Sequence, residues 1–139
     1  MSKLSIIIPV YFNEMNLHDL YEDLYDKVLS QLEDYELVLV DDGSQDASYS
    51  IIQELSRKDS KIVSLKLSRN FGSHAAILAG LNHCKGDCAV MKTADLQEPS
   101  SMILQMYEKW KLGNNVVLAI RSDREESFFQ SFLDRKSVV

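Results

Sequence analysis

The sequence has 139 residues, of which 45% are apolar and 26% are charged. This length permits one domain with a core of its own and leaves no room for a second. The composition excludes disordered, collagen-like and disulfide-rich chains. Lys and Arg number 15 against 21 Asp and Glu, a net charge of −6. Because nucleic-acid binding needs clustered basic side chains, we expect no nucleic-acid partner.

The N-terminal apolar run and the two cysteines indicate in which cellular compartment the protein is found. Pro9 interrupts the first apolar run too early for a signal peptide. No apolar run in the sequence approaches the ~18 residues of a membrane span. Cys84 and Cys88 flank a Gly-Asp turn, a pattern that favours two structural thiols over a zinc site. We therefore expect a cytoplasmic protein.

Alternating strand and helix patterns fill the first half of the chain. The apolar runs at 5–10 and 37–40 have the length and β-branched content of strands buried on both faces. Between them, leucines and a valine recur at steps of three and four over 17–32, which predicts an amphipathic helix of about four turns. A second helix is expected after Asp46, its predicted N-cap. Residues 62–67 alternate polar and apolar, which predicts an edge strand.

The second half of the chain continues the alternation. Ser73 is the predicted cap of a small-residue helix, and 88–92 is the predicted fourth strand. Pro99 is expected near the first position of another helix, which Gly113 should end. Its aromatic and Met stripe is interpreted as core packing. Residues 116–120 are expected to form a fifth strand.

This order predicts an α/β fold with a mostly parallel central sheet and helices on both faces. In such sheets ligands bind beyond the carboxyl ends of the strands. Polar and aromatic residues gather after the first four predicted strands, as Pro-Val-Tyr-Phe-Asn-Glu, Asp-Asp-Gly-Ser, Ser-Arg-Asn-Phe-Gly and Thr-Ala-Asp-Leu-Gln. Neither glycine-rich phosphate motif, GxGxxG or GxxxxGK[ST], occurs in the sequence. A phosphate site here would instead need a divalent cation held by carboxylate and amide oxygens.

Five collinear segments resemble one family. IIIPVYFNE, VLVDDGSQDAS, LSRNFGSHAAILAGL, ADLQEP and the segment containing Arg121 are similar to the N-terminal part of family 2 glycosyltransferases, which have the Rossmann-like GT-A nucleotide-sugar-binding fold. The resemblance is greatest to the branch that transfers sugars to polyprenyl or dolichol phosphate, and it covers essentially all 139 residues. It implies that residues 1–139 are the donor-binding part of one such domain, truncated before the acceptor half and any membrane helices.

The resemblance also implies a set of nucleotide- and donor-binding residues. These are Pro9, Tyr11, Glu14, Asp41, Asp42, Arg69 and Asp95. Tyr11 would stack on the nucleobase, because aromatic faces stack on any base; the alternative is a half-buried tyrosine at a strand end. Asp41 or Asp42 would bind the base or ribose. For Glu14, the alternative is a cap on the first helix.

Asp95 and Gln97 match the family's metal-binding segment, so the implied cofactor is Mg²⁺ or Mn²⁺. Strand alternation predicts that Thr93, Asp95 and Gln97 share one face, with Lys92 on the other. The family has Asp where this chain has Thr93. The missing carboxylate predicts weak metal binding or an impaired enzyme, and Lys92 is predicted to point the wrong way to compensate.

Arg121, Arg124 and Arg135 correspond to the phosphate- and acceptor-binding region of the polyprenyl branch, and Arg is well shaped for bidentate phosphate contacts. Arg124 and Arg135 stand beside acidic residues, so solvated ion pairs are an alternative for them. The implied activity is inverting transfer of a hexose from a UDP- or GDP-sugar to a polyprenyl phosphate or a cell-envelope saccharide. The catalytic base is expected outside this chain. Membrane association is expected only for a longer parent protein, and a homo-oligomer is left open.

Two other functions fit parts of the sequence. Thr93 and the missing downstream half fit a catalytically impaired module that binds a nucleotide sugar without turnover. The acidic pair Asp41 and Asp42 fits an α/β phosphatase or phosphoacceptor fold, but this class needs a nucleophilic Asp after the first strand. Tyr11, Phe12 and Asn13 stand at this place instead.

Overall fold

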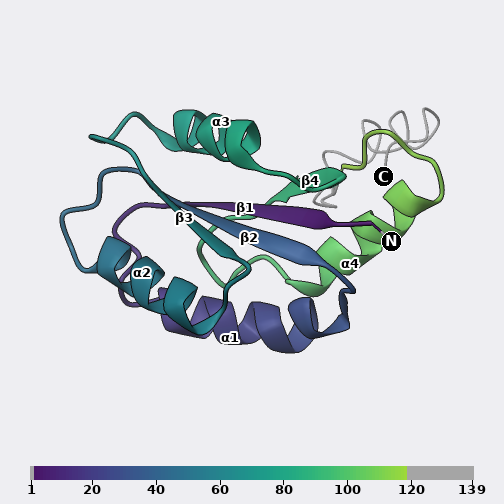
Figure 1. Ribbon diagram of the computed structural model, residues 1–139, viewed down its shortest axis with the longest axis horizontal. Coiled ribbons are helices and arrows are strands. Elements are labelled where there is room, and N and C mark those ends of the chain that lie inside the picture. The colour runs from purple at the N-terminus through teal and green to yellow at the C-terminus, as the bar shows by residue number, and fades with distance from the viewer. Residues whose placement is uncertain (1, 119–139) are drawn as a thin grey trace, which may run out of the picture. The chain divides into compact units, whose positions relative to one another are not determined.

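The computed structural model describes residues 2–118, and these fall in two compact units that divide after Ser100. The first unit is built on a parallel sheet of order β3-β2-β1-β4 (Figure 1). The strands are β1 (Leu4–Val10), β2 (Tyr35–Asp41), β3 (Ile62–Lys66) and β4 (Cys88–Met91). The predicted parallel sheet is confirmed, and β3 lies at an edge as its alternating pattern predicted.

Helices cover both faces of this sheet. α1 (Leu17–Lys27) and α2 (Ser48–Lys58) lie on one face and α3 (Ser73–His83) on the other (Figure 1). α3 approaches the sheet closely because its inner face is made of small residues. A Cβ added at Gly80 would lie 2.6 Å from Cγ2 of Ile7, and Ala76 is fully buried. The small-residue helix and its place against the sheet therefore follow from the sequence.

The core explains the continuous apolar runs of the two central strands. β1 and β2 are paired in register from Leu4 with Tyr35 to Val10 with Asp41. Ile7 and Val38 are fully buried within this pair. Burial of such side chains stabilises a fold by about 1.5–3 kcal/mol each. The strands therefore place the residues that follow Val10 and Asp41 side by side.

α1 is shorter than the predicted four turns. It ends at Lys27, and a 3-10 turn over Leu29–Gln31 follows. Val28 leaves helical geometry at φ −130° and ψ −62°. Val28 and Leu29 are nevertheless buried. The apolar period therefore continues through the 3-10 turn, although the α-helix has ended.

The helix starts also differ from prediction. α2 begins at Ser48 and its N-cap is Ala47, so Asp46 is wrong as the N-cap; it lies one residue earlier, where its Oδ1 accepts the Ser48 N–H at 2.9 Å. Ser73 is wrong as a cap: it is the first residue of α3, and Gly72 precedes it at φ 102°. Gly72 lies outside the helix, and its backbone N–H donates to the Asp42 carboxylate.

The second unit is described over 101–118. It contains α4 (Ser101–Lys111), which starts two residues after Pro99 and not at it. Ile103 and Tyr107 are buried, as the interpretation of its apolar stripe predicted. Gly113 ends the helix at φ 106°, and its N–H donates to the carbonyl of Trp110. Residues 116–118 of the predicted fifth strand are not in a strand, and 119–120 lie outside the described residues.

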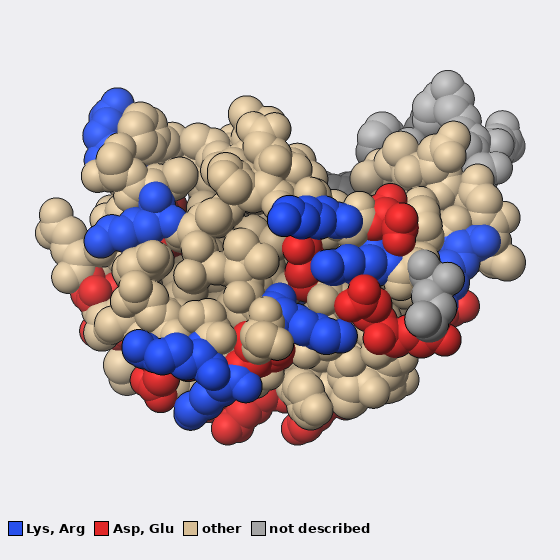
Figure 2. Space-filling view, viewed as in Figure 1, with Lys and Arg blue, Asp and Glu red and all other residues tan. Residues whose placement is uncertain are grey.

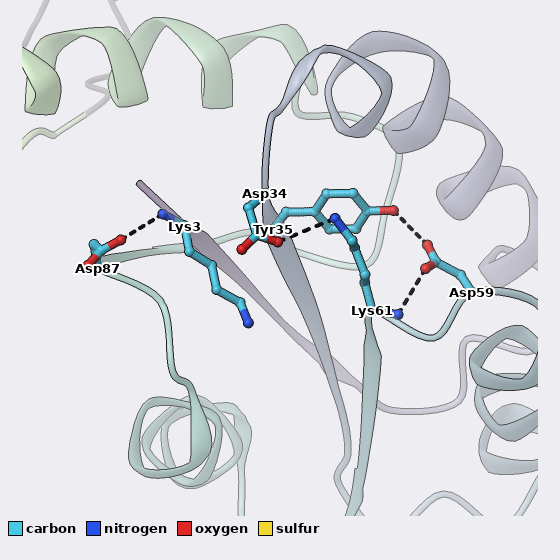
Figure 3. A network of polar contacts seen from close by, with 6 residues as sticks. All are labelled: Lys3, Asp34, Tyr35, Asp59, Lys61 and Asp87. Carbon is cyan, nitrogen blue, oxygen red and sulfur yellow. Dashed lines mark hydrogen bonds and ion pairs between the residues drawn. The ribbon is translucent and has the colours of Figure 1, made fainter. Parts of the chain in front are cut away.

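A polar network covers the amino ends of the strands, opposite the predicted site (Figure 3). Oδ2 of Asp59 accepts the hydroxyls of Tyr21 and Tyr35 at 2.8 and 2.7 Å, and its Oδ1 accepts the N–H of Lys61 at 2.9 Å. Burial, followed by the hydrogen bond to Asp59, raises the pKa of each tyrosine. Burial opposes ionisation of Asp59, but these hydrogen bonds outweigh it and lower the Asp59 pKa.

The face shown in Figure 2 mixes basic and acidic side chains. Near the amino ends of the strands, Lys61 pairs with Asp34 at 3.3 Å and lies over the Tyr35 ring at 4.8 Å (Figure 3). Such exposed pairs contribute little to stability, about 0–1 kcal/mol.

Candidate functional site

Four loops extend from the carboxyl ends of the strands: 11–16 after β1, 42–47 after β2, 67–72 after β3 and 92–100 after β4. Parallel strands bring these ends to one edge of the sheet (Figure 1). β1 and β4 are neighbours although β2 and β3 lie between them in the chain, so the strand order reverses there. This is the place where open α/β sheets bind ligands.

The first loop presents two aromatic rings. Tyr11 and Phe12 are 47% and 49% exposed, and their rings meet edge to face with centroids 4.5 Å apart. Phe12 has φ 53°, an uncommon conformation for a bulky residue. Its N–H donates to Oγ of Ser44 at 3.0 Å, which ties it to the next loop. The exposed rings are thus held in place by backbone contacts, as a stacking surface requires.

Glu14 is a link between loops. Its Oε2 accepts the N–H of Ala47 at 3.0 Å, and its own N–H donates to Oδ2 of Asp46 at 3.4 Å. Hydrogen bonds from the Ser48 hydroxyl and N–H lower the Asp46 pKa, although burial, the largest single effect, acts in the opposite direction. Glu14 therefore satisfies the start of α2, not of α1, where no side-chain cap is present.

Asp42 is the anchor of the third loop. Its Oδ1 accepts the N–H of Phe71 at 2.9 Å, and its Oδ2 accepts the N–H of Gly72 at 3.1 Å. The Asn70 amide donates to Oδ2 at 3.0 Å and to the Asp42 carbonyl at 3.2 Å. Asp42 is 3% exposed. With both carboxylate oxygens occupied, Asp42 holds the loop 70–72 and the start of α3.

Asp41 differs sharply from its neighbour. It is fully buried, and its Oδ2 accepts the N–H of Ser44 at 3.2 Å. Its Oδ1 is buried without a hydrogen-bond partner among the described residues. An unpaired buried oxygen costs about 1–3 kcal/mol. Since Asp41 lies opposite Val10, directly before Tyr11, this free acceptor is next to the aromatic loop.

Gly43 lets the second and third loops touch. Its φ is +77°, and a Cβ here would lie 2.5 Å from backbone atoms of Arg69 and Asn70. Only glycine fits both the positive φ and the close approach. The exposed Arg69 guanidinium stacks on the Phe71 ring, with Cζ 4.3 Å from the centroid. Arg69 is therefore placed at this edge with its cationic group open to solvent.

The fourth loop brings Thr93, Asp95 and Gln97 together, as predicted. Oδ1 of Asp95 accepts the Thr93 hydroxyl at 3.1 Å and the Gln97 N–H at 3.2 Å. β4 ends at Met91, so a side-chain turn brings them together, not the strand alternation on which the prediction rested. The second Asp95 oxygen remains for a ligand.

The residues present fit a weak cation site. Among residues 2–118 no three His, Cys, Asp or Glu side chains cluster as metal ligands. Mg²⁺ commonly takes one or two carboxylates and the phosphate oxygens of its substrate. Asp95 supplies one such carboxylate, and the contact of Gln97 with Asp95 is made by its backbone N–H. Such a site depends on the nucleotide for most of its ligands.

Pro9 and the distal arginines complete the predicted set. Pro9 pairs with Val40 inside β1, but the pairing of β1 with β4 has already ended at Ile7 and Met91. A proline is tolerated there because no neighbouring strand needs its missing N–H. Arg121, Arg124 and Arg135 lie outside the described residues.

Two site residues were not recognised correctly in the sequence. Asn70, which bridges to Asp42, belongs to a quoted motif but carried no predicted role. Lys92 was predicted to lie on the face away from Thr93, and it is 5% exposed where Thr93 is exposed; the contacts of its Nζ with the carbonyls of Thr93 and Asp95, at 3.3 and 3.2 Å, were not predicted. A charged residue in the last position of a predicted buried strand is the signal that could have identified it.

The parallel sheet and its helices match the GT-A fold of solved glycosyltransferases. The model of "Glycosyl transferase family 2" matches residues 5–137, so the chain belongs to this family. A mannosyltransferase from Pyrobaculum calidifontis, solved with GDP-Man and Mn²⁺, superposes with a TM-score of 0.73 at 20% identity over 93% of this chain and 38% of that one. S. aureus TarS 1-349 with UDP-GlcNAc gives a TM-score of 0.69 at 19% identity, over 91% and 38%.

Relatives in sequence are closer. An uncharacterized glycosyltransferase of Bacillus subtilis (strain 168), YkcC, is 43% identical over 91% of this chain and 39% of its own length. An undecaprenyl-phosphate 4-deoxy-4-formamido-L-arabinose transferase of Edwardsiella ictaluri is 42% identical over 91% and 39%. A bactoprenol glucosyl transferase of Shigella phage SfV is 40% identical over 88% and 40%. The chain thus spans about two fifths of the length of these relatives.

Proposed function

We propose that this chain is the donor-binding part of a glycosyltransferase. Its donor would be a UDP- or GDP-sugar, from which the enzyme transfers a hexose to an acceptor. The observation that carries the proposal is Oδ1 of Asp41, a buried acceptor without a partner in the described part of the chain. Uracil and guanine both offer ring N–H groups that would satisfy it. Tyr11, one residue beyond the paired strand, supplies a ring on which the base would stack.

The diphosphate would lie between the third and fourth loops. Arg69 carries an exposed guanidinium, the side chain best shaped for bidentate phosphate contacts. Asp95 and Gln97 would hold a divalent cation weakly, since Thr93 contributes a hydroxyl that is donated to Asp95. When bound, this cation would neutralise charge on the leaving diphosphate. Arg121, Arg124 and Arg135 are proposed to act on phosphates of the donor or acceptor.

The reaction would be a single displacement at the anomeric carbon. An acceptor oxygen forms the new bond to this carbon as its bond to the diphosphate oxygen breaks, and the nucleoside diphosphate leaves with the bonding electrons. Attack from the opposite face inverts the anomeric configuration. Arg69 would stabilise the departing negative charge. A hydroxyl acceptor would need a base to take its proton, and we place this base outside the chain.

We infer a polyprenyl phosphate as the preferred acceptor of the whole protein, with a cell-envelope saccharide as the alternative. The support is the pair of relatives named for transfer to undecaprenyl phosphate and bactoprenol. A phosphate monoester is largely ionised at pH 7, with a second pKa of about 6, so it attacks without a base. In the described residues no helix is long and apolar enough to cross a membrane. Action at the cytoplasmic face of the membrane is part of this proposal.

Calorimetric titration tests donor binding. UDP and GDP are titrated into the 139-residue chain, each with and without Mn²⁺, with adenosine diphosphate as the control. We expect saturable heat with UDP or GDP, and weaker or no heat with adenosine diphosphate, whose base lacks a ring N–H at the equivalent position. Heat with none of the three, in a chain shown to be folded by circular dichroism, would contradict the proposal.

A further inference from the structure

Lys92 is a buried cation for which the donor site described above has no use. Its side chain is 5% exposed at the end of β4. Burying an ammonium group is costly unless hydrogen bonds or charges compensate it. Within residues 2–118 it forms no ion pair shorter than 4.0 Å. Its partners are the carbonyl oxygens of Thr93 and Asp95, at 3.3 and 3.2 Å.

These two carbonyls belong to the loop that carries the candidate metal ligand. Lys92 therefore lies at the base of the loop and fixes the backbone on both sides of Ala94, which is itself 6% exposed. With this backbone fixed, Oδ1 of Asp95 can hold Thr93 and Gln97 through its side-chain turn. Lys92 thus acts on the candidate site through the loop.

The far end of the loop is also anchored. The Ser100 hydroxyl donates to Oδ2 of Asp23 at 2.6 Å, and Oδ1 of Asp23 pairs with Lys27 at 2.7 Å. The hydrogen bonds from Lys27 and Ser100 lower the Asp23 pKa, and the charge of Lys92 contributes to this shift. Lys92 is therefore close enough to α1 for its charge to be felt there. The loop 92–100 is thus held at one end by Lys92 and at the other by the contact of Ser100 with Asp23.

The charge of this loop is unusual for a metal site. With Thr93 in place of a second carboxylate, Asp95 is the one acidic group in 92–97, and Lys92 offsets it. The whole loop 92–100 also contains Glu98, so its net charge is −1, and Lys92 halves the number of uncompensated carboxylates that a diphosphate would meet. A pair of uncompensated carboxylates would repel it until a divalent cation was bound.

We propose that Lys92 is a positioning residue whose fixed positive charge lets the donor diphosphate bind with little help from a divalent cation. This inference rests on the proposed donor site. It explains why a lysine is buried at the base of the loop that carries Asp95, and it makes Lys92 and Thr93 two parts of one arrangement. The binding of nucleotide should then depend only slightly on Mn²⁺.

The test is calorimetric titration of UDP and GDP in a chelator and in millimolar Mn²⁺, with the unsubstituted chain and with Lys92→Met. Methionine keeps most of the side-chain volume and removes the charge. In chelator we expect Lys92→Met to weaken binding about tenfold, the effect of losing a charge in a partly buried site. In Mn²⁺ the loss should be about threefold or less, because the cation restores the positive charge.

The ratio of the two affinities separates the inference from a purely structural role. A structural defect weakens binding equally in both conditions, whereas loss of the charge raises the Mn²⁺ dependence. Lys58→Met, which removes an exposed cation on α2, is the matched control and should leave the ratio unchanged. If Lys92→Met does not fold, Lys92→Gln takes its place, since it keeps a donor for one carbonyl.

Each outcome decides something different. An unchanged ratio in Lys92→Met or Lys92→Gln overturns the role of Lys92 and leaves the donor site standing. An unsubstituted chain that binds only with Mn²⁺ also overturns it. A folded chain that binds neither nucleotide in either condition overturns the proposed function, and this inference with it.

Discussion

The carboxylate of Asp42 accepts the backbone N–H of Phe71 at 2.9 Å, across 29 positions of the sequence. Through this contact the end of β2 determines where the loop after β3 lies. The same loop carries Arg69, whose guanidinium stacks on Phe71. Asp42 therefore has a structural role, whereas we assign its neighbour Asp41 to ligand binding. Substitution of Asp42 should lower stability, and substitution of Asp41 should weaken nucleotide binding.

Asp42→Ala should lower the free energy of unfolding by about 2–3 kcal/mol, because buried N–H groups lose a charged acceptor. Chemical denaturation at pH 7 measures the change. Asn70→Ala, which removes one donor to the same carboxylate, should cost less, about 1 kcal/mol. Equal stability of Asp42→Ala and the unsubstituted chain would show that the loop does not depend on this carboxylate.

Asp41→Asn should change stability by less than about 1 kcal/mol, because an amide oxygen still accepts the Ser44 N–H and a buried charge is removed. Nucleotide binding should nevertheless fall about tenfold or more, since a neutral amide is a weaker acceptor for a base N–H. Denaturation and calorimetry on the same sample give both values. Undiminished nucleotide affinity in the folded variant would remove Asp41 from the donor site.

Gly43→Ala tests the contact between the second and third loops. The added Cβ would lie 2.5 Å from the backbone of Arg69 and Asn70, so the loops must separate. We expect a loss of at least about 2 kcal/mol in stability, together with weaker nucleotide binding. Gly72→Ala is the matched control: its φ is +102°, but a Cβ there meets nothing within 4 Å. Gly72 has ψ 157°, a region essentially restricted to glycine, so this variant should lose about 1–3 kcal/mol from backbone strain without a clash. A loss from Gly43→Ala no larger than that from Gly72→Ala would argue against the clash.

Much of this arrangement was predictable from the sequence, because each part depends on local pattern. The buried runs around Ile7 and Val38 indicated a parallel sheet, and parallel topology alone places Tyr11, Asp41 and Asp95 at one edge. The structural role of Asp42 and the separate, ligand-binding role proposed for Asp41 could not be predicted. It depends on which carboxylate meets the backbone of a loop 29 residues away, and adjacent identical residues carry no signal for this.

Helix ends and the role of Lys92 were missed for related reasons. The apolar period continues through Val28 although the helix has ended, because burial does not require α-helical geometry. Strand alternation placed Lys92 on the face away from Asp95. Lys92 is indeed buried where Thr93 is exposed, but its contacts with the carbonyls of Thr93 and Asp95 form after β4 has ended at Met91. A side-chain rule for strands does not apply once the strand has ended.

The Asp59 network should make stability depend on pH at both extremes. The Asp59 pKa lies below its usual 3.8, so its contribution is present above this value and is lost as the pH falls further. The pKa values of Tyr21 and Tyr35 lie above the usual 10.0, so their contribution is present below pH 10 and is lost as the pH rises further. Denaturation from pH 2 to 11 should show both losses.

Asp59→Asn should flatten both limbs of this profile, because it removes the shifted carboxylate and the charge that acts on the tyrosines. Tyr21→Phe should flatten chiefly the alkaline limb. The measurement is the unfolding free energy of each variant at matched pH. An alkaline limb that Asp59→Asn leaves unchanged would contradict the assignment.

The most direct test of the donor site is the mapping of backbone amide chemical shifts during titration with UDP and with GDP. The account predicts that one nucleotide shifts the amides of Tyr11, Ser44 and Gln97, at the carboxyl edge of the sheet. The amide of Lys61, at the opposite edge, should not move. Shifts confined to Lys61 and its neighbours, or no shifts with either nucleotide, would contradict a donor site at the carboxyl ends of the strands.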